Sequence, residues 1–171
     1  MQESNNNKDD RGLTLLHDIK LKMSSKTNDG KFESINYYVY PCLFLEIFKP
    51  VMHSKDWNSN NMYIKLTLKD HLFIKKYFDA FEKKVAKLGV EYPCNSYHLK
   101  DAENGIFIIR LNIPKKYQVF NENVSEQVLT KFPVPNYTFT KIKIKIKNLW
   151  VIFNPDRTIS GTNIEIDTIT L

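Results

Sequence analysis

Four lysines that alternate with isoleucines near the C-terminal end of the chain have the types and the spacing to bind a polyanion. Residues 141–147 read Lys-Ile-Lys-Ile-Lys-Ile-Lys, and a period of two is typical of a β-strand with one apolar and one polar face. Lys141, Lys143, Lys145 and Lys147 therefore share one side of the predicted strand, and no acidic residue interrupts them. A row of cations can follow the phosphates of a nucleic acid. The alternative is a plain solvated face, on which lysines also protect a strand edge from aggregation.

Aromatic side chains supply the second contact that a single-stranded nucleic acid needs, because unpaired bases stack on aromatic rings. Tyr63 and Lys65 lie on the outward side of one predicted strand, and Arg110 lies on the outward side of another. Other rings fall on a shared strand face or in predicted loops, where an apolar core does not explain them. The complete candidate set for nucleic-acid binding is Lys141, Lys143, Lys145, Lys147, Lys65, Arg110, Tyr63, Tyr38, Tyr40, Trp57, Tyr117 and Tyr137.

Several of these residues also have a purely structural interpretation. Tyr38 and Tyr40 can pack against a neighbouring element instead of stacking on bases. Arg110 can pair with Glu165 or Asp167 if those acids lie on the adjoining strand. Trp150 has the same parity as the isoleucines of 142–146, so we expect it in the core unless a bulge at Asn148 reverses the alternation.

Composition favours a folded, basic domain with an anionic partner. The chain has 171 residues, of which 42% are hydrophobic and 13% aromatic, and its formal net charge is +6. This suits one domain over residues 13–171 preceded by a disordered tail at 1–12. Cys42 and Cys94 do not form a metal-binding or disulfide pattern, and the N-terminal residues lack a signal-peptide pattern. We therefore expect an intracellular protein with no cofactor, no metal and no membrane contact.

Periodicity predicts several strands and one helix. The helix begins with Asp70 as its N-cap and ends at Gly89, and Phe73, Tyr77, Phe81, Val85 and Leu88 form its apolar stripe. The predicted strands are 13–23, 35–48 with a bend near Pro41, 62–68, 106–113 and the two arms of a hairpin over 141–171, while 24–34, 49–61, 90–105 and 115–140 are predicted as loops.

The order of these elements predicts a mainly β fold, a five- to six-stranded Greek-key barrel of OB type with one helix after the third strand. An α+β sandwich with one helix is the competing architecture. In a barrel of this type the long connections would carry ligand-binding loops.

The terminal pattern also carries a resemblance. A basic alternating strand, then Leu149-Trp150-Val151, a polar turn, Gly161 and Ile164-Glu165-Ile166-Asp167-Thr168-Ile169 resembles the last hairpin of the single-stranded-DNA-binding OB-fold proteins of large DNA viruses. The segment 63–70 followed by a helix is similar to their middle. The resemblance implies coating of single-stranded viral DNA during replication or recombination, in the host nucleus or at a cytoplasmic replication site.

Enzymatic motifs are missing from the sequence. The four histidines are scattered, and no nucleophile elbow, phosphate-binding loop or zinc motif occurs. We therefore expect a non-enzymatic, largely sequence-independent single-stranded-DNA-binding protein, with RNA as a related ligand and self-association along the strand as a further possibility. The alternative from another class is a protein-interaction module whose basic sheet face binds an acidic partner.

Overall fold

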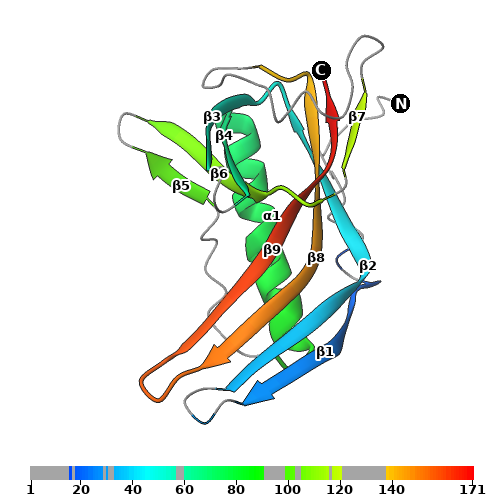
Figure 1. Cartoon of the computed structure of the whole chain (residues 1–171), viewed down its shortest axis with the longest axis vertical. Helices are drawn as coiled ribbons and strands as arrows, with labels where there is room; N and C mark the ends of the chain where they lie inside the picture. The colour runs from blue at the N-terminus through cyan, green and yellow to red at the C-terminus, as the bar shows by residue number, and fades with distance from the viewer. Residues whose placement is uncertain are drawn as a thin grey trace, which may run out of the picture.

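The computed structural model describes residues 16, 18–28, 30, 33–56, 60–90, 99–102, 105–115, 117–120 and 138–171, and it is mainly β with one helix in this part of the chain (Figure 1). The elements are β1 (Lys20–Asn28), β2 (Glu33–Phe48), β3 (Val51–Asp56), β4 (Asn61–Leu66), α1 (Leu68–Lys87), β5 (Leu99–Ala102), β6 (Ile106–Asn112), β7 (Gln118–Phe120), β8 (Lys141–Phe153) and β9 (Thr158–Thr170). The predicted tail at 1–12 lies outside the described residues.

One open, mixed sheet replaces the predicted OB-type barrel. Its strand order is β1-β2-β8-β9-β6-β4-β3, with β5 added beside β6 and β7 beside β9. Closure would require pairing between the two ends, and within the described residues β1 pairs with β2 and β3 with β4. The mainly β class with one helix is confirmed, while the closed five- to six-stranded barrel is wrong for the described residues.

The strand count and the position of the helix also differ from the prediction. The predicted loop at 49–61 contains β3, which forms a hairpin with β4. The helix therefore follows the fourth strand, not the third. Two further short strands, β5 and β7, lie within the predicted loops at 90–105 and 115–140. Strands of three or four residues are too short to show a period of two, so their pairing partners define them.

The helix begins one turn earlier than the sequence suggested. Thr67 is the N-cap, and its hydroxyl accepts a hydrogen bond from the backbone N–H of Asp70. Asp70 itself is buried, and its carboxylate accepts a hydrogen bond from the backbone N–H of Phe48. Asp70 therefore joins the start of the helix to the end of β2, in place of the predicted N-cap role.

The helix α1 lies across one face of the sheet (Figure 1), and its apolar stripe belongs to the core cluster. Phe73, Tyr77, Phe81 and Val85 are buried as predicted, whereas Leu88 lies past the last helical turn and is exposed. Gly89 has a φ of 91° and ends the helix. The stripe packs in one cluster with the isoleucines of β8 and β9, so this face of the sheet is the inner face.

The opposite, outer face of β2, β8 and β9 carries the polar side chains of the predicted ladder. Ile142, Ile144 and Ile146 are fully buried, and each lies opposite an isoleucine of β9, which confirms the predicted alternation of β8. Their neighbours Lys141, Lys143, Lys145 and Lys147 are half-buried or exposed. Strand parity thus holds from residue 141 to residue 146.

Two irregularities interrupt the strand pairing, and the one in β8 changes the parity beyond residue 146. The pairing of β8 with β9 shifts between Ile146 and Asn148, so Leu149 is fully buried and Trp150 turns to the outer face. The expectation of Trp150 in the core is therefore wrong, and the bulge at Asn148 is the physical reason. On β2 the register against β8 shifts between Tyr38 and Leu43, the place where the sequence predicted a bend near Pro41.

Candidate nucleic-acid interface

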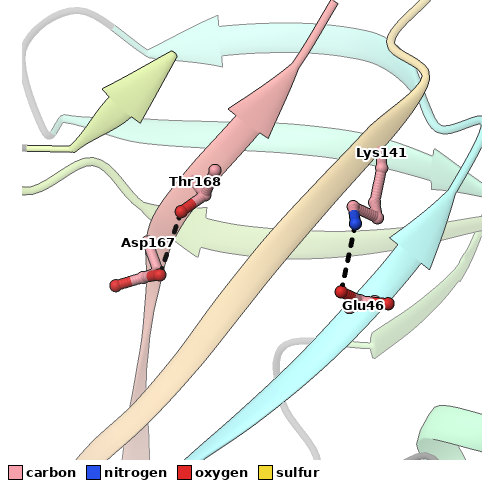
Figure 2. A network of polar contacts seen from close by, with 4 residues as sticks. All are labelled: Glu46, Lys141, Asp167 and Thr168. Carbon is pink, nitrogen blue, oxygen red and sulfur yellow. Dashed lines mark hydrogen bonds and ion pairs between the residues drawn. The ribbon is translucent and has the colours of Figure 1, made fainter. Parts of the chain in front are cut away.

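The first cation of the predicted ladder already has an acidic partner on the adjacent strand. The Nζ of Lys141 lies 3.2 Å from the Oε1 of Glu46 on β2 (Figure 2). The two side chains meet diagonally, because Glu46 is directly opposite Lys143 in the register of β2 and β8. A phosphate that approaches Lys141 therefore also meets the carboxylate of Glu46.

The next two cations lie beside an aromatic ring and a second acid. The Nζ of Lys143 and that of Lys145 are 4.7 Å and 5.9 Å from the centre of the Phe44 ring, within the range of a cation–π contact. Glu165 on β9 is directly opposite Lys145. The central part of the ladder is thus a surface of mixed charge with its own internal partners.

Two exposed tyrosines occupy the same face of β2, closer to the β1–β2 turn. Tyr38 exposes 48% and Tyr40 exposes 70% of its surface. On the edge strand β1, Lys22 lies directly opposite Tyr38 and Lys20 directly opposite Tyr40. Residues that face each other in an antiparallel pair project to the same side. We call these four residues the tyrosine–lysine patch.

The lysines of this patch differ from the ladder in their neighbours. Lys20 and Lys22 are exposed and form no ion pair within the described residues. By contrast, Lys26 on the same strand lies 2.8 Å from Glu33, and this hydrogen-bonded pair raises the pKa of Lys26 above its usual value. The patch therefore combines two cations with two exposed rings, and proteins bind single-stranded nucleic acids through these two kinds of side chain.

Polar side chains and one indole extend this face across β8 and β9. Asn148 lies between Tyr38 on β2 and Asn163 on β9, and the amide Nδ2 of Asn163 donates a hydrogen bond of 3.2 Å to the Oδ1 of Asn148. Two residues further along β8, Trp150 lies opposite Gly161. We call Asn148, Trp150 and Asn163 the amide–indole site.

The other predicted contact residues lie elsewhere on the sheet. Tyr63 and Arg110 are directly opposite each other on β4 and β6, and Lys65 follows on β4. All three are half-buried, and the strands β8 and β9 separate them from β2. The Nε of Arg110 is buried without a hydrogen-bond partner in the described residues. The described residues contain no ion pair of Arg110 with Glu165 or with Asp167. Asp167 accepts a hydrogen bond from the hydroxyl of Thr168 (Figure 2).

The remaining predicted residues are not brought to the patch. Tyr117 is half-buried just before β7, and Trp57 and Tyr137 lie outside the described residues. Lys147, the last cation of the ladder, is exposed in the bulge of β8 next to Asn148. Lys147, Tyr38 and Tyr40 are thus the predicted residues that lie in or next to the tyrosine–lysine patch.

Lys20 and Lys22 were missing from the candidate set. Their alternation was visible in the sequence, with Leu21 between them. Their function as neighbours of the two tyrosines depends on the register of β1 against β2, which pairs 20 with 40 and 22 with 38. A shift of one residue would send these lysines to the other face.

The described part of the chain contains no group of three or more histidine, cysteine, aspartate or glutamate side chains placed to hold a metal ion. None of its helices has the length and apolar character needed to span a bilayer. Searches against protein-family models, curated proteins and solved structures found no match to this chain.

Proposed function

We propose that this protein is a non-enzymatic single-stranded-DNA-binding protein that acts through the outer face of β1, β2 and β8. The observation that carries the proposal is the tyrosine–lysine patch, in which two exposed rings each lie opposite an unpaired cation in the described structure. The ladder, which first suggested this function, contributes mainly through Lys147 at the end next to the patch. In a viral protein, such binding would serve DNA replication or recombination.

The patch suits a flexible strand better than a duplex. Tyr38 and Tyr40 are two residues apart on one strand, which places them about 7 Å apart. Each ring can stack on one base and contributes about 1–3 kcal/mol. In a duplex the faces of the bases are already stacked on each other, so the rings would have no base to contact. The contacts do not depend on a closed barrel, because a single sheet face provides all of them.

Fluorescence anisotropy with a labelled oligo-dT strand tests this function. We expect binding to oligo-dT that weakens steeply as salt concentration rises, and weaker binding to a duplex of the same length. An RNA strand of matched length shows whether the affinity depends on the sugar, ribose or deoxyribose. The proposal is refuted if oligo-dT does not bind at low salt, or if the duplex binds equally tightly.

The double variant Tyr38→Leu, Tyr40→Leu assigns the binding to the patch. Leucine keeps an apolar side chain but removes the stacking surface, so we expect the affinity for oligo-dT to fall at least tenfold, given the contribution of each ring. Phe120→Leu is the matched control, since Phe120 is also an exposed ring but lies on β7, opposite the end of β9. Equal losses in both variants would remove the patch from the mechanism.

A protein partner is the second candidate, and it concerns the ladder half of the outer face. Phe44 and Phe48 are exposed there, between charges of both signs. Such a surface suits a partner of mixed charge better than the acidic partner that the sequence suggested. Sedimentation velocity of the protein and of Phe48→Ser tests the simplest case, self-association. A sedimentation coefficient that does not change with protein concentration would exclude that case.

A further inference from the structure

The indole of Trp150 fills the space that a side chain at Gly161 of β9 would occupy. If residue 161 carried a Cβ, that atom would stand 2.4 Å from the Cζ2 of Trp150 and 2.6 Å from its Cε2. The indole therefore covers the backbone of Gly161, and glycine is required there for the two strands to hold the ring in this position. Trp150 is half-buried, so part of the ring remains open to solvent on the outer face.

Next to the indole, one hydrogen bond joins the side-chain amides of Asn163 and Asn148 and leaves the other polar atom of each amide without a partner in the described residues. Asn163 donates one hydrogen of its Nδ2 to the Oδ1 of Asn148. The described residues provide no other partner for the Nδ2 of Asn148 or the Oδ1 of Asn163. The pair therefore presents a free donor and a free acceptor, one on each strand. Asn148 and Trp150 share the outer face, because the residue between them is fully buried.

We propose that the amide–indole site is a base-binding subsite, in which one unpaired nucleobase stacks on Trp150 and directs its hydrogen-bonding edge to Asn148 and Asn163. This inference rests on the proposed function and names the part of the ligand that the site holds. Adjacent residues on the same strand face are about 7 Å apart, which is a suitable distance between a stacked base and the groups at its edge.

The subsite is continuous with the tyrosine–lysine patch. Tyr38 is directly opposite Asn148 across β2 and β8, so a strand that leaves the tyrosines reaches the amides next. Each of the four DNA bases has a donor and an acceptor side by side on its pairing edge, so the amide pair can serve all of them. The subsite therefore favours unpaired bases without selecting a sequence. In a duplex both the edge and the faces are occupied.

Fluorescence of Trp150 gives a direct readout of stacking. The chain has two tryptophans, so the variant Trp57→Phe leaves Trp150 as the only one. We expect its emission to be quenched when oligo-dT is added, with the same midpoint as an anisotropy titration of the same variant. An oligonucleotide with the same phosphates but with abasic sites should bind more weakly and leave the emission unchanged.

Substitutions in the site complete the test. Trp150→Leu should lower the affinity for oligo-dT by about 5-fold to 150-fold for the loss of one stacked base. Separately, Asn148→Ala with Asn163→Ala should lower this affinity through the loss of the hydrogen bonds to the base edge. Affinity for the abasic strand should not change. Ile152→Ala is the matched control, because Ile152 lies on the same strand and face, two residues beyond Trp150. Near-UV circular dichroism checks that each variant is folded, and the asparagine variant keeps the test valid if Trp150→Leu does not fold.

The possible outcomes separate this inference from the proposed function. Binding of oligo-dT without quenching, together with unchanged affinity in the asparagine variant, overturns the subsite and leaves the proposed function intact. A protein that does not bind oligo-dT at all overturns both. Quenching by oligo-dT that the abasic strand does not reproduce, with weaker binding in both variants, supports the subsite.

Discussion

Neutralising Lys20 and Lys22 should weaken DNA binding more than neutralising three lysines of the ladder. In single-stranded DNA each phosphate that a cation neutralises adds about 0.7 to the slope of log affinity against log salt concentration. Lys20 and Lys22 form no ion pair in the described structure, so the double variant Lys20→Gln, Lys22→Gln should lower the slope by about 1.4. At 0.1 M salt the same relation corresponds to roughly a 25-fold loss of affinity.

The ladder should respond less, although it has more lysines. Lys141 is bound to Glu46, and Lys145 lies opposite Glu165. When DNA binds beside such a carboxylate, the carboxylate repels the phosphate and offsets the gain from the lysine. The triple variant Lys141→Gln, Lys143→Gln, Lys145→Gln should therefore lower the slope by less than about 1, well below the 2.1 expected of three free cations.

Anisotropy titrations with oligo-dT at several salt concentrations measure both slopes. Lys26→Gln is the control for general effects of charge on β1, because Lys26 is exposed on the same strand but bound to Glu33. We expect its slope to stay close to that of the parent protein. A triple variant that loses more slope than the double variant would contradict this reasoning and return the interface to the ladder.

Three further predictions concern stability. Gly161→Ala places a Cβ 2.4 Å from the Cζ2 of Trp150, so the indole must move by about 1 Å. We expect a shifted tryptophan emission in the Trp57→Phe background and a free energy of unfolding in urea that is lower by about 1–3 kcal/mol. An unchanged emission would be inconsistent with the contact. Tyr77→Phe removes a hydroxyl that is buried without a hydrogen-bond partner in the described residues and whose burial raises its pKa well above the usual range. The free energy of unfolding should rise by about 1 kcal/mol. A fall of that size would show that the hydroxyl has a partner. Burial, and secondly the charge of Asp79, raises the pKa of Glu82, so the folded state binds this proton more tightly than the unfolded state, and ionised Glu82 lowers the free energy of unfolding as the pH rises past the unfolded pKa. Glu82→Gln should therefore raise the urea midpoint at pH 7 but not at pH 3. An equal rise at both pH values would argue against the ionisation of Glu82 as the cause.

Local patterns were sufficient for the buried stripe of the helix and for the core-facing isoleucines of β8. The stripe from Phe73 to Val85 and the isoleucines from 142 to 146 are buried as their spacing predicted. In both cases the period of the apolar residues matches the period of the element, so the buried face follows from the sequence alone. The end of the helix at Gly89 was predicted from the glycine itself, which takes the positive φ that a helix end requires.

Irregularities and pairings between distant strands could not be derived in this way. One extra residue near Asn148 moves Trp150 from the predicted core to the outer face, and the sequence indicated the position of this bulge only as an alternative. Whether the sheet closes into a barrel depends on the pairing of its two edge strands, β1 and β3, which belong to different segments of the sequence. Neither feature leaves a periodic signal within one segment.

The comparison of the two lysine groups shows why a basic strand is weak evidence for a binding surface. Lys141 and Lys22 belong to similar alternating segments of the sequence, yet Lys141 has a carboxylate at 3.2 Å and Lys22 has a tyrosine opposite. The difference arises on β2, where Glu46 and Tyr38 occupy the same outer face but lie on opposite sides of Pro41. A carboxylate satisfies the neighbouring cation and repels a phosphate, whereas a ring leaves the cation available and adds a stacking surface. The residue on the adjacent strand therefore decides whether a lysine can serve a polyanion, and on this sheet it favours the end that carries the tyrosines.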